Sequence, residues 1–189
     1  MSEPISLTRE QYLDSIRQSK ASAIELAEGL TMTQMTWQPG GGARWSVAEC
    51  LDHLASATGI FLDAMQPAIS QAGPGANASQ FRATGFISKK LVLETEPPPK
   101  RKLSSPAKIR PRPTLNPEGI LPRFLESLDR ISALVASTAG KDLNRVRFHP
   151  PLIPLLRISA GSGLLLVAAH VRRHLWQAGQ VTQEPDFPR

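Results

Sequence analysis

Apolar residues recur at the three- and four-residue spacing of an amphipathic helix in four parts of the chain, at about residues 8–38, 46–71, 116–140 and 159–181. Between these parts, proline and glycine interrupt the pattern. No part alternates apolar and polar residues as a half-buried strand does. Four amphipathic helices without strands favour an all-α fold, an antiparallel four-helix bundle. The length suits one domain, so we expect residues 1–189 to form a single bundle.

The starts of the predicted helices are marked by residues that cap helix N-termini. Thr8 with Gln11, and Ser46 with Glu49, match the capping box, in which each side chain satisfies a backbone N–H of the other residue. The remaining starts are marked by Asn116 before Pro117 and by Ser159 or Ser162. We expect the helices to end before Pro39, at Gln71, near Gly140 and at about Val181.

A long, proline-rich, basic loop is predicted between the second and third helices, from about residue 94 to residue 116. A short helix over Phe81–Leu93 precedes it, and six prolines between residues 97 and 113 then exclude regular structure. Residues 89–112 contain eight lysines and arginines against two glutamates, which accounts for most of the net charge of +6. A loop of this length in a compact domain is often functional.

Three features of the chain bear on its location. Residues 1–20 are polar and lack the apolar core of a signal peptide. The longest apolar run, Gly163–Ala169, is far too short to cross a bilayer. The single cysteine cannot form an internal disulfide, so an oxidising compartment is not indicated. We therefore expect a cytoplasmic protein without a membrane partner.

Two of the four histidines, His170 and His174, stand one helical turn apart in the last predicted helix and share a face. His53 is the only other histidine on an apolar helical face, whereas His149 lies in a proline-rich link. Three neutral imidazoles can bind one divalent cation and leave a position open for water. The alternative is a solvated pair, since two arginines separate His170 from His174. Burying three histidines without a metal or a carboxylate would be costly.

Other polar residues near these histidines have competing interpretations. Glu49 could orient His53, although it already has a role in the capping box, and Gln177 could hydrogen-bond near the site. We expect Asp52 to be solvated or paired on the surface, and Cys50 to be a small core residue.

Two sequence motifs resemble those of the DinB-like (YfiT-like) metalloenzyme superfamily. The segment Arg44–Leu54, RWSVAECLDHL, resembles the signature W-S-x-x-E-x-x-x-H-L that opens its second helix. The segment Ala168–Gln177, AAHVRRHLWQ, resembles the motif H-x-x-x-H-x-x-Q on its fourth helix. The similarity covers about residues 8–70 and 117–182, so it does not explain the basic loop.

The resemblance implies a four-helix bundle, often a homodimer, in which His53, His170 and His174 bind one divalent metal ion, with Zn or Ni expected first. It implies a small-molecule substrate and either hydrolysis or S-transfer with a low-molecular-weight thiol. The reactive group would then be a metal-bound water or thiol, and the sequence identifies no catalytic side chain. The alternative is a non-catalytic bundle whose basic loop binds an acidic partner or nucleic acid. Nucleic acid is disfavoured because no aromatic residue is interleaved with the cations at 100–112.

Overall fold

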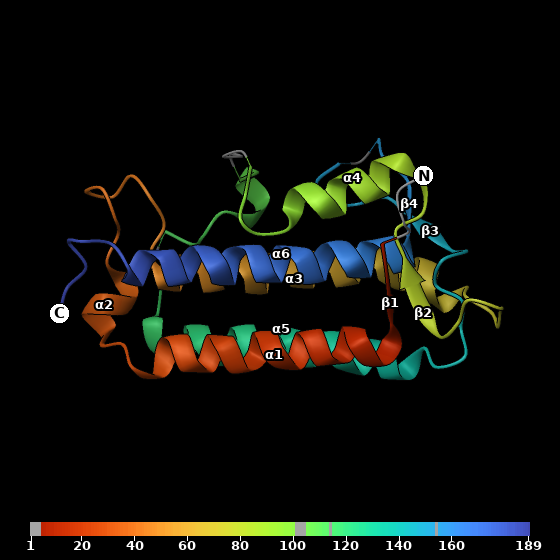
Figure 1. Cartoon of the computed structure of the whole chain (residues 1–189), viewed down its shortest axis with the longest axis horizontal. Coiled ribbons are helices and arrows are strands. Elements are labelled where there is room, and N and C mark those ends of the chain that lie inside the picture. Colours follow the sequence, from red (N-terminus) through yellow and green to blue (C-terminus); the bar gives the residue numbers. More distant parts are fainter. Residues whose placement is uncertain (1–4, 101–104, 114, 154) are drawn as a thin grey trace.

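Four long helices form the body of the molecule in the computed structural model, which describes residues 5–100, 105–113, 115–153 and 155–189 (Figure 1). They are α1 (Arg9–Glu28), α3 (Val47–Ser70), α5 (Pro117–Ser137) and α6 (Ala160–Thr182). Helix α3 packs against α5 and α6, and α1 packs against the same two helices. The expected all-α four-helix bundle is confirmed.

The direction of the helices explains the long connection in the middle of the chain. Helices α1 and α6 run one way along the bundle, and α3 and α5 run the other way (Figure 1). The neighbours α3 and α5 are therefore parallel, and the chain must return along the whole bundle between them. Residues 71–116 make this return, which is why the connection is long.

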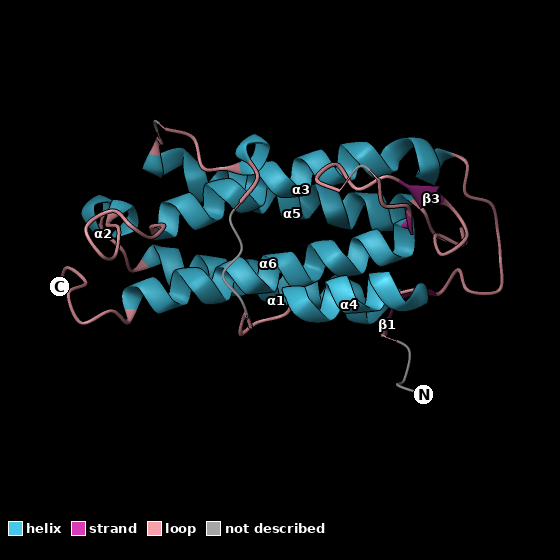
Figure 2. Ribbon diagram, turned by 90° about the horizontal axis from the view of Figure 1, so that it is seen from above, coloured by secondary structure: helices cyan, strands magenta, loops and turns pink. Residues whose placement is uncertain are grey.

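The return begins with strand β2 (Gln80–Arg82) and continues with helix α4 (Gly85–Thr95), which packs on the outer side of α6 (Figure 2). The expected helix over Phe81–Leu93 therefore starts later, because Phe81 is the central residue of β2. After α4, the proline-rich loop runs to the far end of the bundle, and one helical turn, η1 (Ala107–Ile109), contacts α3.

The expectation of no strands was wrong in detail. Strand β1 (Ser6–Thr8) pairs with β2, and β3 (Arg147–Phe148) pairs with β4 (Ile158–Ser159), both antiparallel. These strands have two or three residues each, so they are too short to show an alternating pattern. Strand β1 lies directly before α1 and β4 directly before α6, so each pairing joins the start of a long helix to a more distant loop segment.

The cap residues are largely where the sequence placed them. Both capping boxes are complete: Thr8 with Gln11 on α1, and Ser46 with Glu49 on α3. Ser159 caps α6, whereas Asn116 stands at the start of α5 without a side-chain hydrogen bond. The first predicted helix is two helices, because α1 ends at Glu28 and α2 (Met32–Thr36) begins with its own capping box, Thr31 with Gln34.

The apolar run of α6 lies at the centre of the core. Residues 160–169 are all buried, and the large buried side chains around them include Tyr12, Met65 and Phe124. Gly163 allows the helices to approach closely, because a Cβ atom there would lie 2.8 Å from the sulfur of Met65 on α3 and 2.7 Å from the ring of Phe148. The close contact at Gly163 thus packs α6 on α3, the two helices that also carry the three histidines. Within the described residues, no helix is long and apolar enough to cross a membrane.

Candidate metal centre

Three histidines from two helices converge at one point between α3 and α6. His53 comes from α3, and His170 and His174 come from successive turns of α6. One ring nitrogen from each lies within 4.8 Å of those of the other two. The ring centroids are 4.4 to 5.0 Å apart, and the Nε2 atoms of His53 and His170 are separated by 3.1 Å. The structure thus brings together all three histidines that the sequence singled out.

The ring of His53 is held by the proline-rich loop. Its Nδ1 lies 2.6 Å from the backbone carbonyl oxygen of Ile109 in η1. A carbonyl oxygen only accepts hydrogen bonds, so Nδ1 carries the proton and donates. The lone pair of His53 is therefore on Nε2, the atom that faces His170. Glu49 has the capping role and does not orient His53. Its carboxylate accepts hydrogen bonds from the backbone N–H of Ser46 and the side chain of Gln38, and the carbonyl of Ile109 orients the ring of His53 instead.

The ring of His174 is oriented by the residue that the sequence pointed to. Nδ1 of His174 lies 2.9 Å from Oε1 of Gln177, one turn further along α6. With Nδ1 as the donor, the lone pair of His174 is on Nε2. A metal-binding imidazole commonly donates its other N–H to an amide or carbonyl oxygen, which sets the tautomer and the ring orientation. Both His53 and His174 have this arrangement.

The surroundings keep the three imidazoles neutral. Burial is the largest cause that lowers the pKa of each histidine below its ordinary value. The pKa of His174 is lowered to about 3, with the charge of a protonated His53 as the second cause. The pKa of His170 is lowered well below its usual range by burial, then by His174, His53 and Arg173. A neutral imidazole is the form that binds a metal ion.

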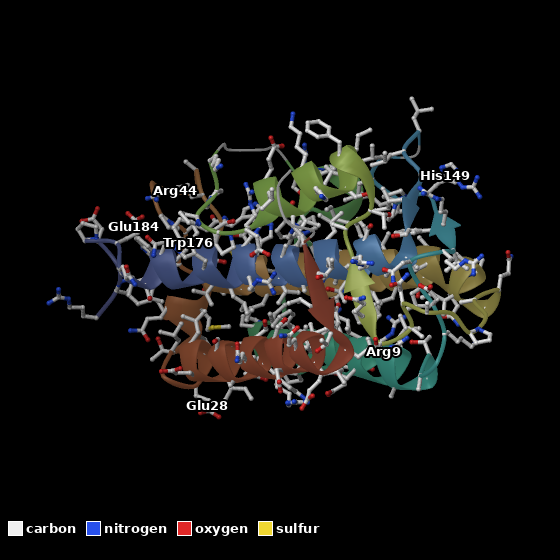
Figure 3. All side chains as sticks on the ribbon, turned by 45° about the vertical axis from the view of Figure 1, so that its right-hand side comes forward. Arg9, Glu28, Arg44, His149, Trp176 and Glu184 are labelled. Atoms are coloured by element: carbon white, nitrogen blue, oxygen red, sulfur yellow. The ribbon has the colours of Figure 1, made fainter. Side chains whose placement is uncertain are left out.

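Trp45 closes one side of the cluster. Its ring lies 4.8 Å from the ring of His53 and 5.8 Å from that of His174, centroid to centroid. Its neighbour Arg44 forms an ion pair of 2.5 Å with Glu184, which follows α6 (Figure 3). This contact joins the loop before α3 to the C-terminal end of α6, so the wall of the cluster is tied to both helices.

The position expected for Asp52 was wrong. Its side chain is fully buried, and its carboxylate accepts hydrogen bonds from Arg112 and Arg123. Local sequence gave no sign of this burial, because both arginines are distant along the chain. Cys50 is a buried core residue, as expected, and burial raises the pKa of its thiol. His149 lies at the opposite end of the molecule from Arg44 and so from the cluster (Figure 3).

The donor set fits a divalent transition metal. Two imidazole nitrogens bound to one metal ion at about 2.0–2.1 Å lie roughly 3 to 3.4 Å apart, and the His53–His170 pair is at 3.1 Å. Three neutral imidazole nitrogens, two of them in rings with a fixed tautomer, suit Zn, Ni and related ions, whereas Mg²⁺ and Ca²⁺ prefer oxygen ligands. Among the described residues, the group that could hold a metal ion consists of these three histidines.

Comparisons with known proteins agree with the fold and the motifs. Residues 15–178 match the DinB superfamily, a range that includes all three histidines. A solved structure with the same fold is described as "YfiT from Bacillus subtilis is a probable metal-dependent hydrolase with an unusual four-helix bundle topology". It aligns with a TM-score of 0.59 and 16% sequence identity over 97% of this chain and 92% of that chain. No curated protein matches the sequence. The chain belongs to the DinB superfamily.

Proposed function

We propose that this protein is a divalent-metal-dependent enzyme that acts on a small molecule, with His53, His170 and His174 as the metal ligands. The observation that carries the proposal is the convergence of three imidazoles whose lone pairs can face one point. Two of them donate their Nδ1 proton to a protein oxygen, on Ile109 and on Gln177, which leaves Nε2 as the metal-binding atom. Without a metal, Nε2 of His53 has Nε2 of His170 as its partner at 3.1 Å, whereas a divalent ion at this point would bind both of these nitrogens and that of His174.

The residues around the histidines have distinct roles in this proposal. When bound, a divalent ion would supply a Lewis acid that lowers the pKa of a water or thiol at its open position. The carbonyl of Ile109 and the amide of Gln177 hold the rings of His53 and His174 in the ligand tautomer. Trp45 stacks beside both rings and keeps bulk water from that side. The buried position of the site strengthens each electrostatic interaction inside it.

We favour hydrolysis as the reaction, with transfer of a low-molecular-weight thiol as the second candidate. The similar protein YfiT is described as a probable metal-dependent hydrolase, which supports the first. In hydrolysis, water would form the new bond to the electrophilic atom of the substrate, and the leaving group would depart with the proton. In S-transfer, the sulfur of the thiol would take the place of that water. Zn and Ni are the ions that we expect first, because imidazole suits both.

The non-catalytic alternative receives less support. It assigns the basic loop to an acidic partner or to nucleic acid, yet loop cations make contacts within the molecule. Arg112 binds the carboxylate of Asp52, and Arg110 donates to the carbonyl of Ser105. Arg101 and Lys102 lie outside the described residues.

Three further predictions belong with this proposal. We propose a single domain over residues 1–189, supported by the apolar core that all four long helices share. We propose a homodimer, on the resemblance to the superfamily alone. We propose a cytoplasmic location, which rests on the single, buried cysteine.

The test is the metal content of protein purified without a histidine tag. We expect about one divalent ion per chain by elemental analysis, and its loss in the double variant His170→Ala/His174→Ala. His149→Ala is the matched control, because it removes a histidine at the other end of the molecule (Figure 3). Wild-type protein that binds neither Zn nor Ni after incubation would refute the proposal. Wild-type protein that binds metal would next be screened with ester, amide and thiol substrates, each with and without a chelator.

A further inference from the structure

A fully buried carboxylate lies directly beside the metal centre, on Asp52. Its two oxygens accept hydrogen bonds from the backbone N–H of Arg112 at 2.9 Å and from Nε of Arg112 at 2.9 Å. The guanidinium of Arg123 on α5 donates to the same carboxylate and also to Ser56. Asp52 is thus the point where α3, α5 and the proline-rich loop meet.

The same loop also reaches the next residue of α3. The carbonyl of Ile109 accepts the Nδ1 proton of His53, and Arg112 binds Asp52 three residues further on. The consecutive residues Asp52 and His53 of α3 therefore bind Arg112 and Ile109, which lie three positions apart in the loop. Ile109 itself is buried, so its side chain adds an apolar anchor between these two polar contacts.

We propose that Asp52 is a positioning residue of the metal centre, which anchors the loop segment 107–112 on α3 and thereby holds the Ile109 carbonyl against His53. In this proposal the proline-rich basic loop, which lies outside the two family motifs, has the role of orienting a metal ligand. The effect of Asp52 on metal binding rests on the proposed function. The effect of Asp52 on the ring of His53 does not, because it can be measured in metal-free protein.

The charges explain why this anchor is strong. A buried carboxylate is costly unless it is paired and hydrogen-bonded, and Asp52 has both kinds of partner. If the loop lifted from α3, Asp52 would lose the backbone N–H and the guanidinium of Arg112 together. The prolines on either side of Arg112, Pro111 and Pro113, stiffen the chain at this contact. The loop therefore stays docked, and the Ile109 carbonyl has a fixed direction.

The experiment compares Asp52→Asn with Asp63→Asn. Asp63 also lies on α3 and also pairs with an arginine of α5, Arg130, at 2.8 Å, but both of these side chains are exposed. The first readout is the tautomer of His53 in metal-free protein at neutral pH, from two-bond ¹H–¹⁵N correlation of the imidazole ring. The second readout is the affinity for Zn²⁺, measured by competition with a chelating dye.

We expect wild-type protein and Asp63→Asn to show His53 with its proton on Nδ1. In Asp52→Asn we expect this tautomer to be lost or averaged, and the Zn²⁺ affinity to fall about tenfold, the lower end of the effect of removing a partner of a metal ligand. Arg112→Met should shift both readouts in the same direction by less, because the contact of Asp52 with Arg123 remains. This variant decides the question if Asp52→Asn does not fold, since the Arg112 side chain is 50% exposed.

A wild-type tautomer of His53 in Asp52→Asn, or in Arg112→Met where only that variant folds, would overturn the inference. Failure of the proposed function would give a different result from failure of this inference. Wild-type protein would then bind no Zn²⁺, while the tautomer of His53 would still report on Asp52 in the metal-free protein. A change in Zn²⁺ affinity equal in Asp52→Asn and Asp63→Asn, with no change in tautomer, would also count against a positioning role.

Discussion

The backbone carbonyl of Ile109 lies 2.6 Å from Nδ1 of His53, although the two residues are 56 positions apart in the chain. This contact makes the proline-rich loop a part of the candidate metal centre. It also fixes which nitrogen of His53 has a free lone pair, because the carbonyl can accept only from an N–H. On α6, the side chain of Gln177 has the same effect on His174.

Replacing Gln177 should weaken metal binding without unfolding the protein. In Gln177→Ala, Nδ1 of His174 loses its acceptor, and the ring no longer prefers the tautomer with a free Nε2. We expect the Zn²⁺ affinity to fall about tenfold or more, as is usual when such a partner is removed. Gln180→Ala is the control, since Gln180 is exposed on the same helix and contacts Gln183. Equal affinities in the two variants would show that Gln177 does not orient His174.

Metal binding should raise the thermal stability of the protein. A ligand that binds only the folded state at one hundred times its dissociation constant adds about 2.7 kcal/mol to the free energy of unfolding. We therefore expect Zn²⁺ or Ni²⁺ to raise the Tm measured by calorimetry, and Mg²⁺ to have no effect. The variant His170→Ala/His174→Ala should not respond. A response of equal size in that variant would place the bound metal elsewhere.

The metal-free protein should lose stability as the pH falls below about 6.5. The folded-state pKa values of the three histidines lie below the ordinary value, mainly through burial, and that of His174 is lowered to about 3. Between these values the unfolded chain binds more protons than the folded chain, so the free energy of unfolding decreases as the pH is lowered. The charged or titratable groups that face His174 are His53 on α3 and His170 and Arg173 on α6. Protonated His53 and Arg173 lower the pKa of His174, and protonation of His174 in turn lowers the pKa of His170.

Denaturant titrations of metal-free protein between pH 7.5 and pH 4 would measure how steeply the free energy of unfolding changes with pH. We expect this dependence to be weaker in His170→Ala/His174→Ala, which lacks two of the three groups. Acidic residues elsewhere contribute equally to the wild-type protein and the double variant. If the free energy of unfolding changed with pH equally in the wild-type protein and the double variant, the pKa values of His170 and His174 would not be lowered by folding.

Two glycines of α6 should respond in opposite ways to substitution by alanine. A Cβ atom on Gly163 would lie 2.7 Å from the ring of Phe148 and 2.8 Å from the sulfur of Met65. We expect Gly163→Ala to lower the free energy of unfolding by about 1–3 kcal/mol through overpacking. Gly179 has no atom within 4 Å of such a Cβ, so Gly179→Ala should stabilise by about 0.5–1 kcal/mol through helix propensity. Chemical denaturation would test both, and a stabilised Gly163→Ala would contradict the close packing of α6 on α3.

Most of the helices could be predicted because their signals are local. The capping boxes at Thr8 and Ser46 each lie within four residues, and the apolar stripes repeat within a few turns. The pairing of His170 with His174 follows from the helix geometry alone. The break between α1 and α2 was missed, although the box Thr31–Gln34 is present, because apolar residues continue past Leu30 and obscure it.

Signals between neighbouring residues were enough to place the starts of the four long helices, their apolar faces and the pair of histidines on α6. The packing of the helices was needed to show that α3 and α5 run parallel, that Asp52 is buried between Arg112 and Arg123, and that a carbonyl of the basic loop orients His53. The arginines that pair with Asp52 are 60 and 71 positions away, and the carbonyl of Ile109 is a backbone group that every residue has. Contacts of this kind depend on how the helices pack, and no local pattern of side chains encodes them.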